Sequence, residues 1–295
     1  MMRPAGPLVM AFCLALTLLG CAPRARTDAG RLQVTVSVLP QKYLVERIGG
    51  DHVAVNVLVG PGDEPHSYEP VAEQLRALTR SAVCFTVGVE FEAAWMDRFL
   101  SANRAMEVVD TTAGIDLLPI EEHGHSDADA AHEGLDPHVW VSPRRAAQMA
   151  RTIADTLVRL DPAHEDAYRA NLAAFLADVE ALDAEIRAEL AGVEGRKFMV
   201  FHPAWGYFAA DYGLEQVAIE VGGQEPSAAE LAAILTEARA SGIRVVFAQP
   251  SLSTRSAETI AREIGGRVVA IDPLAEDWLA NLRQVAAALA EALAD

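Results

Sequence analysis

The sequence predicts an α/β protein in which two similar parallel-sheet α/β lobes are joined by one long rigid helix. Short β-branched runs alternate with helical segments in both halves of the 295-residue chain, and a long segment rich in Ala, Leu, Glu and Arg separates the halves. Repeated strand–helix units are typical of parallel sheets with helices on their faces. The length and the 51% hydrophobic content allow one large core or two of ordinary size.

Residues 1–21 are predicted to be a lipoprotein signal peptide. Arg3 gives a positive start, residues 8–19 are almost wholly apolar, and the small Gly20 directly precedes Cys21. This pattern favours cleavage before Cys21 and attachment of a lipid to its sulfur, although a plain signal peptide or a weak membrane anchor would have a similar composition. The apolar stretch is shorter than the roughly 20 residues that a membrane-spanning helix needs. We therefore expect an extracytoplasmic protein tethered to the membrane by its lipid.

The N-terminal lobe is predicted to comprise residues 22–160. Its pattern predicts four strands separated by helices, with the strands at 34–39, 53–58, 82–87 and 106–109. A low-complexity segment, residues 121–133, interrupts this lobe and places His123, His125 and His132 among five acidic residues. We expect a mobile loop that is either a solvated polar segment or a loose auxiliary metal-binding loop.

A long linker helix is predicted over residues 161–192. Asp161 and Pro162 suit the N-cap and first helical position, and apolar residues then recur at helical spacing until Gly192. The C-terminal lobe, residues 193–295, repeats the strand–helix alternation. Its strands are predicted at 198–201, 216–220, 245–248 and 267–271, and its helices after Pro203, from the cap residues Ser227 and Ser253, and from about Trp278.

Four remote side chains are predicted to form one metal site. His66 follows the strand at 53–58, His202 directly follows the strand at 198–201, and Asp272 directly follows the strand at 267–271. Ligands of open parallel sheets bind outside the carboxyl ends of the strands. His138 precedes the helical region and closes the first lobe. We therefore expect two ligands from each lobe, facing each other across a cleft.

Three imidazoles and one carboxylate form a ligand set that suits zinc, which is commonly tetrahedral in proteins. Zinc-finger and HExxH patterns do not occur in the sequence. The fold, and not a local loop, must therefore build the site.

The segments around these ligands resemble those of the zinc/manganese ABC-transporter substrate-binding proteins over essentially the whole mature chain. The matching segments are Glu64-Pro65-His66-Ser67-Tyr68-Glu69-Pro70, Asp136-Pro137-His138-Val139-Trp140, Phe201-His202-Pro203-Ala204-Trp205-Gly206 and Ile271-Asp272-Pro273-Leu274. The resemblance implies two lobes on a long backbone helix and a single metal in the cleft. It also implies delivery to a membrane permease driven by an ATPase, and zinc gathering by the acidic histidine loop.

The resemblance favours Zn²⁺, with Mn²⁺ or Fe²⁺ as alternatives. Manganese-type members commonly have a glutamate where His202 stands, and imidazole suits zinc better than it suits manganese. Two features depart from specialised zinc members. The histidine loop is short, and the C-lobe disulfide of some members cannot form, because Cys84 is the only cysteine outside the signal and its lipidation site. We expect Cys84 to be a buried small hydrophobe without function.

Other function classes are less compatible with the sequence. A formal charge of −18 argues against nucleic-acid binding. A zinc hydrolase usually keeps one coordination position open, whereas Asp272 would fill it here. A surface adhesin without transport remains a third alternative, to be separated by metal uptake. We expect a monomer that is not an enzyme.

Residues near the ligands have a structural and a functional interpretation. Trp140, Trp205 and Tyr207 could shield the metal, but core packing is their default role. Asp136 could accept a hydrogen bond from a ligand or could be a turn residue. His52 and His164 are expected to be solvated.

Overall fold

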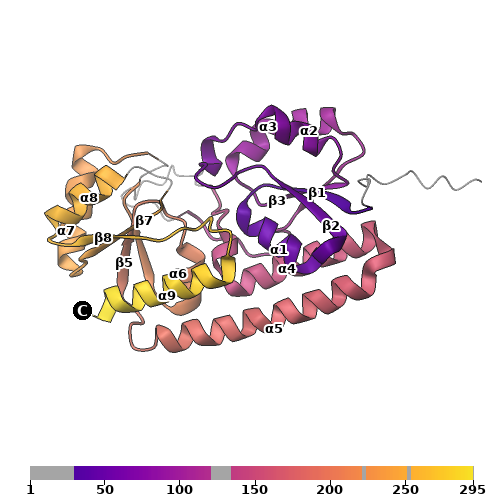
Figure 1. Cartoon of the computed structure of the whole chain (residues 1–295). Helices are drawn as coiled ribbons and strands as arrows, with labels where there is room; N and C mark the ends of the chain where they lie inside the picture. The colour runs from indigo at the N-terminus through magenta and orange to yellow at the C-terminus, as the bar shows by residue number, and fades with distance from the viewer. Residues whose placement is uncertain (1–29, 121–133, 221–223, 251–253, 295) are drawn as a thin grey trace, which may run out of the picture.

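The computed structural model describes residues 30–120, 134–220, 224–250 and 254–294, and shows two α/β lobes side by side on one long helix (Figure 1). The predicted fold class is therefore confirmed. The predicted signal peptide with Cys21, the histidine segment 121–133 and the predicted cap Ser253 lie outside the described residues.

The N-terminal lobe contains a four-stranded parallel sheet in the order β2-β1-β3-β4. Its strands are β1 (Leu32–Val36), β2 (Val53–Val57), β3 (Val83–Thr86) and β4 (Glu107–Asp110), and its helices are α1 (Leu39–Gly49), α2 (Ala72–Leu78), α3 (Glu90–Ala102) and α4 (Pro143–Leu160). The prediction of a strand at 34–39 is wrong at its end, because Leu39 and Pro40 form the first turn of α1. Proline is tolerated there, since a helix start leaves its N–H groups without intrahelical partners.

The C-terminal lobe contains a second parallel sheet with the equivalent strand order, β6-β5-β7-β8. Its strands are β5 (Lys197–Val200), β6 (Glu215–Ala218), β7 (Val245–Ala248) and β8 (Arg267–Ala270), and its helices are α6 (Gly206–Tyr212), α7 (Ala228–Ala240), α8 (Thr254–Glu263) and α9 (Trp278–Ala294). Ser227 caps α7 as predicted, through a reciprocal capping box with Glu230.

Helix α5 (Glu165–Glu189) is the predicted long linker helix, called the strut below. It lies along both lobes (Figure 1). It packs against α4 and α1 of the first lobe and α9 of the second. The predicted cap is wrong, because Pro162–His164 form a separate 3-10 turn in which the Asp161 side chain caps no backbone N–H. The buried Asp161 carboxylate instead accepts hydrogen bonds from Tyr168 Oη at 3.1 Å and His164 Nδ1 at 2.8 Å.

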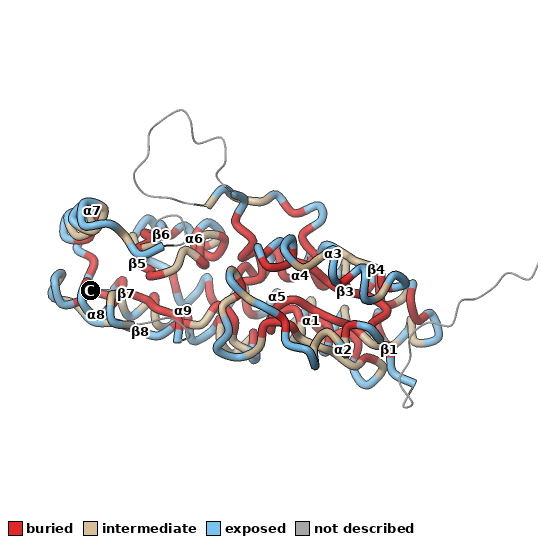
Figure 2. Tube along the Cα trace, turned by 90° about the horizontal axis from the view of Figure 1, so that it is seen from above, coloured by how far each residue is buried: buried red, intermediate tan, exposed pale blue. Residues whose placement is uncertain are grey.

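One continuous apolar core runs from the N-terminal sheet through α5 into the C-terminal lobe, and buried segments extend along the length of the molecule (Figure 2). A smaller cluster lies beneath α7 and α8. The shared core joins the two lobes, so neither lobe is packed independently of the strut. Among the described residues, no helix has both the length and the apolarity to cross a bilayer.

Two predictions about single residues have opposite outcomes. Cys84 is fully buried in β3, as predicted, and burial raises the pKa of its thiol to about 12. His52 and His164 are not simply solvated, because their rings stack with centroids 3.9 Å apart. The contact with Asp161 and the stacking together tie the start of the strut to the N-terminal lobe.

Candidate metal centre

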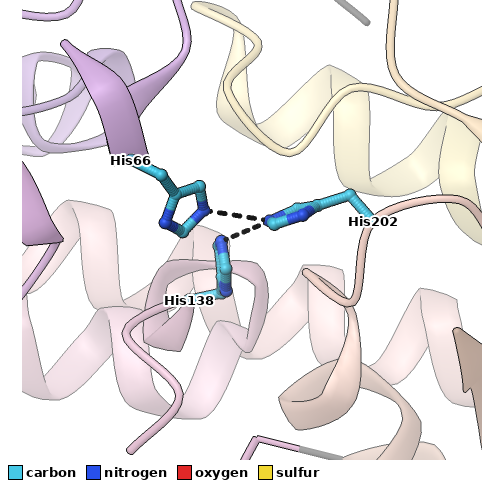
Figure 3. Close-up of side chains that lie close together, drawn as sticks. All are labelled: His66, His138 and His202. Atoms are coloured by element: carbon cyan, nitrogen blue, oxygen red, sulfur yellow. Dashed lines mark hydrogen bonds between the residues drawn. The ribbon is translucent and has the colours of Figure 1, made fainter. Parts of the chain in front are cut away.

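Three imidazoles from the two lobes meet at one point. His66 and His138 come from the N-terminal lobe and His202 from the C-terminal lobe, and their rings turn toward one another (Figure 3). His202 Nε2 lies 3.1 Å from His66 Nε2 and 3.3 Å from His138 Nε2, and the ligand atoms of all three lie within 4.8 Å of one another. Two nitrogens of a tetrahedral zinc site lie about 3.3 Å apart, given Zn–N bonds of about 2.0–2.1 Å. The two spacings from His202 therefore match those of a single zinc site, and the third nitrogen lies close enough to join it.

Local backbone geometry presents each ligand. His66 lies in the 3-10 turn Pro65–Ser67, where Pro65 occupies the first position and Glu64 accepts a hydrogen bond from the His66 N–H. His138 lies directly before the 3-10 turn Val139–Val141 that leads into α4. His202 follows β5 after one further residue, so that it projects from the carboxyl end of the second sheet. The predicted placement at strand ends is correct for His66 and His202.

Each imidazole has a carboxylate on its other nitrogen. His66 Nδ1 lies 2.5 Å from Glu90, His138 Nδ1 lies 2.7 Å from Asp136, and His202 Nδ1 lies 2.6 Å from Glu220. An ionised carboxylate only accepts hydrogen bonds, so each Nδ1 carries the proton. The three Nε2 atoms then have their lone pairs directed toward the common point. Such outer contacts fix the tautomer and raise the basicity of metal-binding histidines.

The pKa values of His66 and His138 are shifted in opposite directions. Burial alone would lower the pKa of His66, but the hydrogen bond and charge of Glu90 outweigh it, and the pKa lies above its usual value. For the buried His138, burial lowers the pKa below its usual value despite the charge of Asp136. The neutral form, which binds metal, is therefore favoured more in His138 than in His66.

The fourth predicted ligand lies beside the three histidines and not among them. Asp272 lines a neighbouring cavity, while the next two residues, Pro273 and Leu274, line the cavity of the three imidazoles. Its carboxylate accepts a hydrogen bond from the Leu274 N–H at 2.8 Å, and burial raises its pKa. Glu64, which sequence reasoning missed, does line the histidine cavity, and its carboxylate lies 3.8 Å from His66 Nε2.

Trp140, Trp205 and Tyr207 belong to the core, and Trp140 also lines the histidine cavity. Trp140 is fully buried, lines the histidine cavity, and contacts the His138 ring edge-on at 5.2 Å between centroids. Tyr207 is fully buried, and its hydroxyl group donates to the main-chain oxygen of Asp136. Trp205 packs in the core against Phe208. Trp140 thus packs in the core and also lines the cavity, and Asp136 accepts a hydrogen bond from the candidate ligand His138.

Glu90 and Glu220 were not found from the sequence. Each follows the carboxyl end of a parallel strand, β3 and β6 respectively, which is the signal that identified His202. That signal could have identified them as residues of the site edge. Their pairing with particular histidines depends on tertiary contacts that the sequence pattern does not specify.

Comparison with known proteins relates this geometry to one family. Residues 34–292 match the family model described as zinc-uptake complex component A, periplasmic. This chain belongs to that family. The match spans both lobes and the strut, and includes His66, His138, His202 and Asp272. The resemblance stated from the motifs is therefore confirmed.

Individual proteins with zinc-related names are similar to most of this chain. The "Zinc-binding lipoprotein AdcA" of Streptococcus pneumoniae is 31% identical over 90% of the chain, which spans 54% of that relative's length. The "High-affinity zinc uptake system protein ZnuA" of Bacillus subtilis is 30% identical over 85% of the chain and 81% of its own length. A crystal structure of a ZnuA deletion mutant with zinc bound is 44% identical, with a TM-score of 0.82 over 89% of this chain and 98% of that one.

Proposed function

We propose that this protein captures one zinc ion between its lobes, outside the cytoplasm, and delivers it to an ABC importer. The convergence of three Nε2 atoms, each opposite a carboxylate-bound Nδ1, is the observation that supports zinc most directly. Neutral imidazole favours zinc over manganese, for which harder oxygen ligands are more suitable. Membership of the zinc-uptake component A family supports delivery to a permease and its ATPase.

Asp272 is proposed as the fourth ligand. It directly precedes two residues of the histidine cavity and lines the neighbouring cavity, so its carboxylate lies beside the three imidazoles. A carboxylate in this position would complete a four-ligand set, which leaves no open position for a reacting water. We therefore infer binding and release, without catalysis, by a monomeric lipoprotein held to the membrane through Cys21.

The decisive experiment is metal binding by the purified chain that lacks residues 1–21. We expect one zinc per chain, displacement of bound Mn²⁺ by Zn²⁺ in competition, and loss of binding in His202→Ala. His164→Ala is the matched control, because that histidine lies outside the three-histidine cluster. A preference for Mn²⁺, or hydrolytic turnover that disappears in His202→Ala, would contradict the proposal.

The fourth ligand is tested by a pair of isosteric variants. Asp272→Asn should weaken zinc binding more than Glu64→Gln does, if Asp272 coordinates the ion. The opposite order would assign the fourth position to Glu64, whose carboxylate already lies in the histidine cavity. Full affinity in Asp272→Asn would remove Asp272 from the ligand set.

A further inference from the structure

Tyr207 forms a contact between the lobes that leads directly to a proposed ligand. Its hydroxyl group donates to the main-chain oxygen of Asp136 at 2.7 Å and accepts a hydrogen bond from the Leu118 N–H at 3.0 Å. Tyr207 belongs to α6 of the C-terminal lobe, whereas Leu118 and Asp136 belong to the N-terminal lobe. Burial raises the pKa of the tyrosine hydroxyl to about 12, so it remains a donor at physiological pH.

Asp136 is the residue that orients His138. One oxygen, Asp136 Oδ1, accepts hydrogen bonds from both His138 Nδ1 and the His138 main-chain N–H, at 2.7 and 2.8 Å. The Asp136 main-chain N–H is held by the Leu118 oxygen at 2.8 Å. The residue is 3% exposed, so these contacts restrain its position. Any displacement of the Asp136 backbone therefore changes the direction of the His138 imidazole.

The same C-terminal segment also presents a ligand of its own. His202 and Tyr207 are separated by only four residues, because His202 lies in the short connection between β5 and α6 and Tyr207 lies in the first turn of α6. Gly206 lies close to the same carboxylate, because a Cβ atom built there would be 3.2 Å from Asp136 Oδ2. One segment of the C-terminal lobe thus lies against the N-terminal lobe at three points: the two histidines His66 and His138, the Asp136 main-chain oxygen and the Asp136 carboxylate.

We propose that Tyr207 is a positioning residue that makes the orientation of His138 depend on contact with the C-terminal lobe. When the lobes are in contact, Tyr207 holds Asp136, and Asp136 holds His138 Nδ1. Separation of the lobes would remove His202 from the ion and release the restraint on His138 together. Zinc binding and lobe contact are thereby coupled through a residue that does not touch the metal. This inference rests on the proposed zinc site.

The test compares Tyr207→Phe with Tyr212→Phe in the chain that lacks residues 1–21. Tyr212 lies on the same helix, donates to Asp183 at 2.9 Å, and packs against an arginine as Tyr207 does. We expect Tyr207→Phe to lower zinc affinity by about tenfold, through faster dissociation, because loss of an outer hydrogen bond typically costs 10–100-fold in metal affinity. Tyr212→Phe should retain the wild-type affinity.

Two further measurements separate positioning from general destabilisation. The visible spectrum of bound Co²⁺ should change in Tyr207→Phe and remain unchanged in Tyr212→Phe, because it reports the geometry of the ligands. The losses of zinc-binding free energy in Tyr207→Phe and Asp136→Asn should not add in the double variant, since both substitutions act through the orientation of His138. Additive losses, or an unchanged spectrum, would overturn the inference.

Gly206→Ala provides a second route if Tyr207→Phe does not fold. The added methyl group should displace the Asp136 carboxylate and lower zinc affinity without removing a hydrogen-bonding group. Unchanged affinity in this variant would count against the inference. Absence of zinc binding in the wild-type chain would instead refute the proposed function, so the two failures are distinguishable.

Discussion

Trp140 of the N-terminal lobe donates its indole N–H to the main-chain oxygen of Pro273, the residue after Asp272, at 2.7 Å. The main-chain oxygen of Trp140 in turn accepts the indole N–H of Trp278 at 2.7 Å. These buried bonds hold the loop after β8 against the loop that contains His138. The edge of the candidate metal site is therefore held by buried contacts between the lobes.

Trp140→Phe tests this contact. The variant retains a ring but leaves the buried Pro273 oxygen without its donor and creates a cavity, so the free energy of unfolding should fall by about 2 to 4 kcal/mol. Zinc affinity should also fall, because the Asp272 loop loses its support. Chemical denaturation and zinc competition measure the two effects. Trp95→Phe, at a partly exposed position on α3, is the control and should change neither substantially.

Glu90→Gln tests the carboxylate behind His66. The amide cannot stabilise the imidazolium as the carboxylate does, so the pKa of His66 should fall and its basicity as a ligand should decrease. We expect zinc affinity at pH 8 to fall by about 10–100-fold. Asp97→Asn removes an exposed charge from the same helix, α3, and should leave the affinity unchanged. Equal losses in both variants would show a general effect of charge instead of a specific contact.

The fold and the strand-end position of His202 were predictable because their signals are local. A short continuous apolar run marks β5, and a histidine one residue beyond a buried strand must lie near the carboxyl edge of a parallel sheet. The start of the strut was less predictable. Asp161 and Pro162 have the residue types of a helix start, yet the tertiary contacts of Asp161 with Tyr168 and His164 take its carboxylate away from the backbone.

The residues that contact the histidines from outside the cluster could be identified only from the structure. Glu220 meets His202 only because β6 pairs beside β5, and Tyr207 meets Asp136 only because the two lobes are packed together. Neither contact follows from residue spacing, since the partners lie 18 and 71 positions apart. The same holds for Asp272. Its position after β8 predicts that it lies at the carboxyl edge of the sheet, but the sequence does not specify the direction of its carboxylate.

Glu92 should make stability depend on pH. Its carboxylate is 5% exposed, and burial raises its pKa from 4.5 to about 7 although the Val87 and Gly88 N–H groups donate to it. The folded state thus retains a proton that the unfolded chain loses near pH 4.5, so this contribution to stability is complete below that pH and is lost as pH rises through about 7. The raised pKa of Glu92 corresponds to a loss of roughly 3 kcal/mol in the free energy of unfolding between low and high pH, at about 1.4 kcal/mol per pKa unit.

The measurement is urea unfolding of wild type and Glu92→Gln between pH 5 and pH 8. The glutamine side chain is neutral at every pH, so the decline in the free energy of unfolding over this interval should be smaller in the variant than in the wild type. Asp97→Asn should decline as the wild type does, because that carboxylate is exposed. Parallel curves for Glu92→Gln and wild type would show that the Glu92 pKa is not raised in the folded protein.

Removal of zinc should lower the thermal stability of the wild-type chain. The triad cannot exist in the unfolded chain without closing a loop of 136 residues between His66 and His202, so zinc binds the folded state preferentially. At a free zinc concentration 100 times the dissociation constant, binding adds about 2.7 kcal/mol to the free energy of unfolding. Calorimetry with zinc and with a chelator should show this difference for wild type and for His164→Ala. In His138→Ala the difference should shrink strongly, and an undiminished zinc-dependent shift there would place the stabilising ion elsewhere in the protein.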